Sequence, residues 1–180
     1  HGSEAGVAEQ SATVAEVVGD FGGGAFRWAT KTEERNALWK ARHTAYWAAK
    51  AGFPGGQWIV TDVCVPISQL AKAITETEAD LAAHDKEAHI LGHVGDGNFH
   101  ANLLFDDENP EQGKAVEDLS HRMVERSLAM GGTATGEHGI GVGKKKYMEA
   151  EHGAAWDVMG DLKKSLDPQN IMNPGKIFAA

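Results

Sequence analysis

Apolar and polar residues follow one another along the first part of the chain in patterns that predict two helices with a short strand between them. Apolar residues recur at helical spacing over 4–18, and the FGGG run at 21–24 ends that helix. A short strand is expected over 25–29. A second helix, rich in Ala, Glu, Lys and Arg, is expected over 31–51, with Thr30 as its N-cap.

The middle of the chain carries the strongest strand signals. Residues 57–65 are dense in β-branched side chains and are followed by a proline, which is typical of a strand. Ser68 is expected to cap a helix over about 69–84. Two apolar runs, 88–94 and 99–105, flank a Gly-Asp-Gly sequence and therefore predict a β-hairpin.

The C-terminal part of the chain is predicted to be helical around a glycine-rich segment. Asn109, followed by proline, opens a helix that extends to about residue 130. Residues 131–143 contain six glycines and are expected to be irregular. Short helices over 144–151 and 154–166 and an irregular tail complete the chain. Strands separated by helices, together with a hairpin, predict an α+β domain with an antiparallel sheet covered by helices.

Composition narrows the class of protein. A chain of 180 residues is long enough for one domain with a sizeable core. The net charge of −9 argues against a nucleic-acid platform, which needs a basic face. No apolar run approaches the ~20 residues that cross a bilayer. The single cysteine, Cys64, excludes an intramolecular disulfide. The expected location is the cytoplasm, with membrane association as an option, or the mitochondrion in a eukaryote.

The predicted hairpin places two histidines where they can meet. On its return strand, His100 and Asn102 share one face because side chains alternate along a strand. His93 lies at the end of the outgoing strand, and the glycines of the turn leave room for a ligand. The two histidines can therefore converge on one point. The alternative, that both are ordinary structural residues, stays open.

The glycine-rich segment adds a neighbouring carboxylate and imidazole. Glu137 and His138 lie among apolar residues, which is unusual for a solvated linker. Glu137 with His93 and His100 would make a site of two nitrogens and one carboxylate with open positions, as catalytic divalent-metal sites have. His138 would then be a base beside the metal. A merely flexible loop is the alternative.

The helix over 31–51 offers a third candidate. Trp39, Arg42 and Tyr46 fall on one helical face. An arginine among aromatic residues can bind a carboxylate through two parallel hydrogen bonds. The alternative is an amphipathic helix whose arginine simply lies on the surface.

Several motifs together resemble one family of enzymes. They are LWKARH at 38–43, TDVCVP at 61–66, GHVGDGNFH at 92–100, TGEHGIGVGK at 135–144 and LDPQNIMNPGK at 166–176. Over nearly its whole length the chain resembles the C-terminal portion of FAD-linked D-2-hydroxyacid dehydrogenases, closest to the D-lactate dehydrogenase (cytochrome) branch. These enzymes belong to the vanillyl-alcohol oxidase-type flavoprotein superfamily.

The resemblance implies a fold for this chain and assigns substrate binding and FAD binding to different domains. Residues 1–180 would form a ferredoxin-like cap domain with a helical C-terminal tail, which supplies substrate-binding groups. FAD would be bound mainly by an N-terminal domain that precedes residue 1 and is absent from this chain. The chain alone is therefore expected to be redox-inert.

The resemblance also implies the chemistry of the candidate metal site. A divalent metal, zinc or manganese, would be bound at the positions matching His93, His100 and Glu137. The base that removes the proton of the substrate hydroxyl would be His138.

Further residues are matched to substrate and cofactor. Arg42 matches the arginine that holds the substrate carboxylate, and Asn102 matches a substrate-binding asparagine. Asn173 lies in the tail segment that returns towards the flavin, and is the expected cofactor contact. Val60 stands where relatives specific for 2-hydroxyglutarate place a lysine, which favours a short monocarboxylate. The implied reaction is oxidation of a D-2-hydroxy acid, D-lactate before others, to the 2-keto acid.

Other functions are kept as alternatives. Within the family these are D-2-hydroxyglutarate dehydrogenase and a glycolate oxidase subunit. Outside it, a metal-dependent hydrolase or a non-catalytic interaction domain would use the same residues. The expected partners are the small-molecule substrate, the FAD domain and an electron acceptor such as a cytochrome or an electron-transfer flavoprotein. A homodimer is compatible with the sequence.

Overall fold

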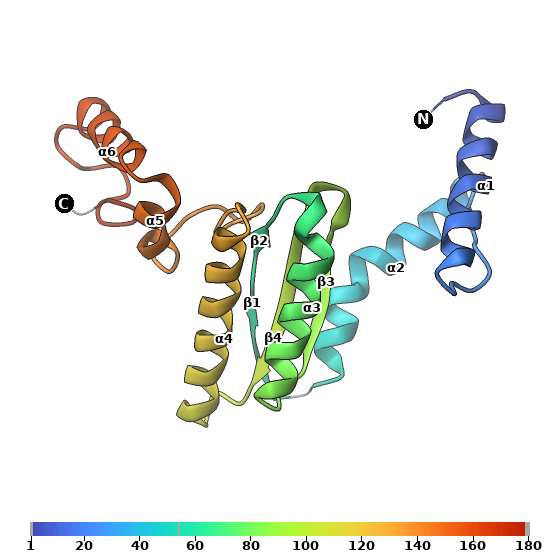
Figure 1. The fold of residues 1–180 in the computed structure, drawn as a ribbon, viewed down its shortest axis with the longest axis horizontal. Coiled ribbons are helices and arrows are strands. Elements are labelled where there is room, and N and C mark those ends of the chain that lie inside the picture. The colour runs from blue at the N-terminus through green and yellow to red at the C-terminus, as the bar shows by residue number, and fades with distance from the viewer. Residues whose placement is uncertain (1, 54, 179–180) are drawn as a thin grey trace. The chain divides into compact units, whose positions relative to one another are not determined.

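The computed structural model describes residues 2–53 and 55–178, which fall into two compact units divided between these ranges. Figure 1 shows the elements of both units. In the described part of the chain, no helix combines the length and the apolar character that a membrane span requires.

The first unit consists of two helices, α1 (Glu4–Asp20) and α2 (Thr32–Ala51). In the part of the chain that the structure describes, neither helix buries a residue. The predicted strand over 25–29 is wrong, because this segment pairs with no strand and is irregular. The predicted cap is also wrong. The cap position of α2 is Lys31, whose side chain makes no capping hydrogen bond, so the helix starts later than Thr30 would have set it.

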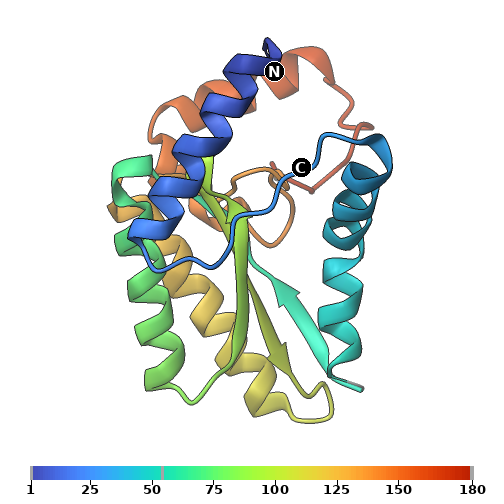
Figure 2. The same ribbon diagram turned by 90° about the vertical axis from the view of Figure 1, so that its right-hand side faces the viewer.

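The second unit is built on an antiparallel sheet whose central strand is β4 (Asn98–Phe105). Along one edge β4 pairs with β1 (Gln57–Val60) and β2 (Val63–Cys64), and along the other with β3 (Ala88–His93). The predicted single strand over 57–65 is therefore interrupted at residues 61 and 62. The α+β prediction with an antiparallel sheet is confirmed (Figures 1 and 2).

Two helices, α3 (Ile67–Ala83) and α4 (Pro110–Ala129), lie side by side over one face of this sheet (Figure 1). They bury the apolar side of β4, on which Phe99, Ala101 and Leu103 alternate. The order strand–helix–strand–strand–helix reproduces five of the six elements of the ferredoxin-like pattern.

The starts of these two helices test the predicted caps. Asn109 caps α4 as predicted, since its side chain accepts hydrogen bonds from the backbone N–H groups of residues 111 and 112. The predicted cap of α3 is wrong. That helix begins at Ile67, with Pro66 at the cap position and no side-chain capping bond, so Ser68 already lies inside the first turn.

The predicted hairpin is confirmed as β3 and β4, joined by the short 3₁₀ turn η1 (Val94–Asp96). Gly97 closes the turn with a φ of 78°, a conformation that favours glycine. A Cβ on Gly97 would lie 2.0 Å from the carbonyl oxygen of Val65. The turn therefore packs directly on the start of α3 and holds the two strands in register.

After α4 the chain is irregular over 131–143, as predicted. It then forms the 3₁₀ turn η2 (Lys145–Tyr147), the short helix α5 (Met148–His152) and the helix α6 (Ala155–Leu166). Tyr147 and Met148 belong to the core of the second unit. The predicted helix over 144–151 is present as η2 followed by α5. The tail beyond α6 is irregular, as expected.

Candidate functional site

The candidate site lies on the face of the sheet opposite to α3 and α4. Along β4 this face carries Asn98, His100 and Asn102, because Phe99 and Ala101 point to the core. The neighbouring strand β3 contributes His93, whose partner in the register is Asn98. The alternation expected from the sequence therefore puts both hairpin histidines on the same side of the sheet.

The glycine-rich loop brings Glu137 to these two histidines. One carboxylate oxygen, Glu137 Oε1, lies 3.0 Å from His100 Nε2 and 3.5 Å from His93 Nε2. Ligand atoms from the three residues all lie within 4.8 Å of one another, so they could hold one metal ion. The His100 side chain is 6% exposed, whereas those of His93 and Glu137 are 43% and 46% exposed. The set thus has one buried member and an open side.

The orientation of the His100 ring shows that this site suits a cation. His100 Nδ1 lies 2.9 Å from the carbonyl oxygen of Thr61 and must donate to it, since a carbonyl only accepts. In the neutral ring, Nε2 then carries a lone pair and faces the Glu137 carboxylate, which is also an acceptor. These two acceptors lie 3.0 Å apart, and a metal ion bound by both would satisfy them together. The donor set therefore fits a divalent metal.

His138 lies beside this set rather than within it. Its ring stacks on that of His100, with 5.0 Å between centroids and 12° between planes. His138 Nε2 lies 3.9 Å from Glu137 Oε1. Asp62, His100 and His138 form a second group with atoms close enough for a metal. The carboxylate of Asp62 is already occupied by protein donors, so the first group is the better candidate.

Asp62 is the buried residue that the sequence analysis missed. Its carboxylate accepts hydrogen bonds from the backbone N–H groups of Gly136, Glu137 and His138. Burial disfavours the charged form, but hydrogen bonds from His138 and other donors outweigh it and hold the pKa of Asp62 well below its usual range. The available signal was an acidic residue inside a run of β-branched residues, because a buried charge needs partners.

Asn102 and Val60 occupy neighbouring positions on the open face. The register pairs Val60 of β1 with Asn102 of β4, and Val60 remains exposed. Asn102 is buried, and its Oδ1 atom accepts no hydrogen bond from the described residues. An unsatisfied buried acceptor is costly unless a ligand or water supplies the donor. Val60 is thus paired with Asn102, which shares the strand face of His100.

Arg42 belongs to the first compact unit. It is exposed on α2, and its guanidinium carbon lies 5.8 Å from the centre of the Trp39 ring. Trp39 and Tyr46 are both exposed, like most of α2. An exposed guanidinium stacked on an aromatic ring is held in a defined orientation while its N–H groups stay available.

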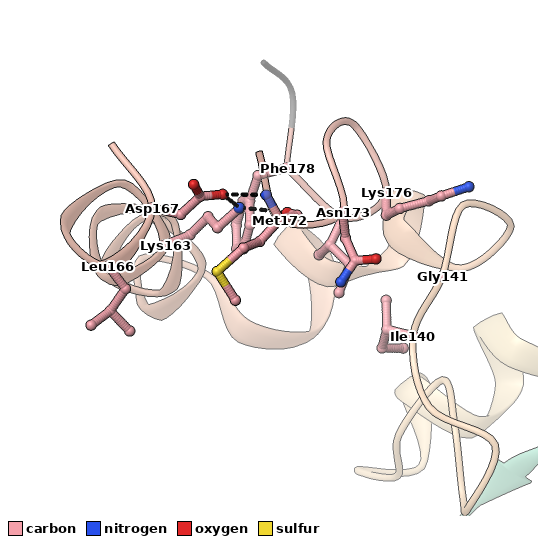
Figure 3. Close-up of a pocket in the computed structure, with 10 residues that line it drawn as sticks. Ile140, Gly141, Lys163, Leu166, Asp167, Met172, Asn173, Lys176 and Phe178 are labelled. Atoms are coloured by element: carbon pink, nitrogen blue, oxygen red, sulfur yellow. Dashed lines mark hydrogen bonds and ion pairs between the residues drawn. The ribbon is translucent and has the colours of Figure 1, made fainter. Parts of the chain in front are cut away.

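Asn173 lies in the tail of the second unit, where its φ of 48° turns the chain. It lines a cavity of about 520 Å³ next to α6 (Figure 3). The neighbouring segment 167–172 is fixed by Asp167, which accepts hydrogen bonds from Lys163 and from the N–H groups of Ile171 and Met172. The remaining lining is mostly apolar and comes from Ile140, Gly141, Leu166, Lys176, Ile177 and Phe178.

Sequence comparisons identify relatives of this chain. The probable mitochondrial D-lactate dehydrogenase of Danio rerio is 48% identical over 179 residues, which are 99% of this chain and 36% of the relative. The mitochondrial D-lactate dehydrogenase (cytochrome) of Arabidopsis thaliana is 44% identical over 98% of this chain and 31% of its own length. The chain therefore spans about a third of the length of these relatives.

A solved structure shares the fold. The 4-ethylphenol oxidase from Gulosibacter chungangensis, in its isoeugenol complex, matches 83% of this chain and 31% of its own with a TM-score of 0.58. The sequence identity is 18%, so this likeness concerns the fold alone.

The family model described as "FAD linked oxidases, C-terminal domain" matches residues 1–177, which include His93, His100, Glu137 and His138. The sheet, its open polar face and the glycine-rich loop that completes that face are thus parts of one recognised domain. The chain belongs to the family of FAD-linked oxidase C-terminal domains.

Proposed function

We propose that this chain is the substrate- and metal-binding part of a flavin-dependent dehydrogenase that oxidises a D-2-hydroxy acid, D-lactate before others, to the 2-keto acid. The observation that carries the proposal is the convergence of His93, His100 and Glu137 on one point of the open sheet face. The names of the D-lactate dehydrogenase relatives support the substrate class.

The chain's own residues would bind and orient the substrate. Arg42 offers two parallel donors to the substrate carboxylate. Asn102 is the second substrate contact that we propose, because its buried amide oxygen still lacks a donor in the described structure. His138 would accept the hydroxyl proton, since its ring is half exposed beside the metal ligands. Val60 is apolar and therefore offers no cation to a second carboxylate.

Two groups would complete the site. A divalent ion, zinc or manganese, held by His93, His100 and Glu137 would lower the pKa of the substrate hydroxyl. FAD supplies the acceptor for hydride. We propose that an N-terminal domain binds most of the FAD and that Asn173 contacts it from the tail. Electrons would then pass to a cytochrome or an electron-transfer flavoprotein, and the mitochondrial relatives favour a mitochondrial location.

The test measures metal content and activity together in the intact protein. Wild type should retain divalent metal after dialysis and should oxidise D-lactate with an artificial electron acceptor. His100→Ala and Glu137→Gln should lose both properties. His121→Ala is the control for replacing a histidine elsewhere, because His121 lies on α4, which covers the other face of the sheet.

Each outcome separates the proposal from an alternative. Loss of metal and activity in the site variants, with both kept in the control, supports the proposal. Metal binding without oxidation of D-lactate, glycolate or D-2-hydroxyglutarate would favour a hydrolase. A His100→Ala protein that keeps its metal and its activity would refute the assignment of the ligands.

A further inference from the structure

We propose that Asp62 is a positioning residue, whose buried carboxylate fixes the backbone of residues 135–138 so that the side chains of Glu137 and His138 face His100. This inference rests on the proposed function, because it assigns a role toward the same metal and substrate site. Asp62 itself would touch neither metal nor substrate.

The position of Asp62 explains how it reaches the loop. It lies at the interruption between β1 and β2, where the backbone leaves the regular ladder. Its side chain is 1% exposed and points to the loop that follows α4. Thr61, the preceding residue, holds His100 through its carbonyl oxygen at 2.9 Å. Thr61 thus orients His100 on the strand, and the next residue, Asp62, orients the loop that carries Glu137 and His138.

The carboxylate is saturated by donors from the loop. Backbone N–H groups reach Asp62 Oδ2 at 2.9 Å from Gly136, 3.1 Å from Glu137 and 2.9 Å from His138. The hydroxyl of Thr135 donates to the same oxygen at 2.7 Å. Consecutive N–H groups that converge on an anion define the path of the backbone. The directions of the Glu137 and His138 side chains follow from that path.

Two residues outside 135–138 also hold Asp62 in place. Asn98 Nδ2 donates to Asp62 Oδ1 at 2.8 Å, which ties the carboxylate to β4. Lys144 Nζ donates to the main-chain carbonyl of Asp62 at 2.5 Å and lies 3.8 Å from its Oδ2 atom. Asp62 therefore binds the loop over residues 135–138 and again at Lys144, which directly follows it. Both oxygens of this carboxylate already accept hydrogen bonds, which disfavours Asp62 as a metal ligand in place of Glu137.

An asparagine at position 62 would not reproduce these contacts. Its amide group would present N–H donors to a pocket already lined with N–H donors, and it would lack the charge. Outer partners that orient metal ligands typically change metal affinity about 10- to 100-fold when they are removed. A purely structural role would lower the stability of the fold but leave the affinity of the folded protein unchanged.

The experiment compares Asp62→Asn with Asp80→Asn in the intact protein. Asp80 is another largely buried aspartate, held by Arg122 and Arg126 between α3 and α4 on the far side of the sheet. Dissociation constants for Zn²⁺ and for Mn²⁺ are measured by competition with a chromophoric chelator. Amide hydrogen exchange is followed over residues 135–138, and thermal unfolding is recorded for both variants.

Asp62→Asn should weaken binding of both metals about 10- to 100-fold and speed exchange of the loop amides. Asp80→Asn should lower the melting temperature but leave metal affinity unchanged. Wild-type affinity and wild-type loop protection in Asp62→Asn would overturn the inference. If the variant does not fold, Thr135→Val removes one donor and keeps the charge, and it should show the same changes on a smaller scale.

Failure of the proposed function would look different. Wild type that binds neither Zn²⁺ nor Mn²⁺ would contradict the metal site, whereas faster loop exchange in Asp62→Asn would still support the positioning role. Normal loop exchange in that variant, with metal bound by wild type, would contradict the positioning role alone.

Discussion

Replacing Gly136 by alanine would insert one methyl group at the most crowded point behind the site. An ideal Cβ at this position would lie 1.8 Å from Asn98 Nδ2 and 2.8 Å from Asp62 Oδ1. Real Cβ contacts stay beyond 3.0 Å, so the Asn98 amide would have to retreat by 3.0 − 1.8 = 1.2 Å or the loop would have to lift. Asn98 is buried and its amide also donates to the carbonyl of Val63 at 2.9 Å, which leaves it little freedom.

The cost has two parts. Overpacking a well-filled interior costs about 1–3 kcal/mol. Loss of the Asn98 hydrogen bond to the buried Asp62 carboxylate adds about 1–3 kcal/mol. We therefore expect the free energy of unfolding to fall by roughly 2–6 kcal/mol. For a domain of this size, the middle of that range lowers the melting temperature by roughly 10 °C.

Thermal unfolding of wild type, Gly136→Ala and Gly143→Ala measures the effect. Gly143 is the matched control, because it lies in the same loop and a Cβ there would meet nothing within 4 Å. Its substitution should change the stability by less than about 1 kcal/mol. Chelator competition with Zn²⁺ should show weaker binding in Gly136→Ala only. Equal melting temperatures for the two variants would refute the argument that the backbone must approach Asn98 and Asp62 closely.

Three further predictions concern substrate and stability. Arg42→Lys should lower kcat/KM for D-lactate by at least about tenfold, because the paired donor geometry is lost while the charge is kept; an unchanged value would remove Arg42 from the substrate site. Val60→Lys should raise the ratio of kcat/KM for D-2-hydroxyglutarate over D-lactate, and an unchanged ratio would mean that Val60 does not face the substrate. Burial opposes ionisation of Asp80, but its arginine partners outweigh burial and hold the pKa of Asp80 below the usual value. The ionised carboxylate therefore stabilises the fold fully above about pH 4, the pKa of an unfolded aspartate. This contribution to the free energy of unfolding is lost as the pH falls through the lower pKa of the folded state. Urea unfolding should therefore show Asp80→Asn less stable than wild type by about 2 kcal/mol at pH 7, with a smaller difference at pH 3.

Local patterns sufficed for the parts of the fold that depend on neighbouring residues. The alternation around Phe99 and Ala101 placed His100 and Asn102 on one face, because the side-chain period of a strand is independent of its partners. Asn109 was a dependable cap because its side chain bonds to the N–H groups of the next turn.

Features that depend on distant segments could not be predicted in this way. The break in the strand over 57–65 arises because Asp62 binds a loop more than 70 positions later. The partners of Asp62 come close to it only in the folded chain, because they follow α4. The segment 25–29 has a strand-like composition, but a strand also requires a partner, and local pattern does not supply one.

The geometry of the site depends on whether the number of residues added to or removed from the turn η1 is even or odd. Because side chains alternate, deleting one residue between His93 and Asn98 would shift β3 by one position against β4. His93 would then turn into the core, and Ile90 would turn out to the open face. Adding two residues would preserve the faces, whereas adding one would not. Over evolutionary time, this turn should therefore accept changes of residue more readily than single insertions or deletions, since the ligand set depends on an even or odd count.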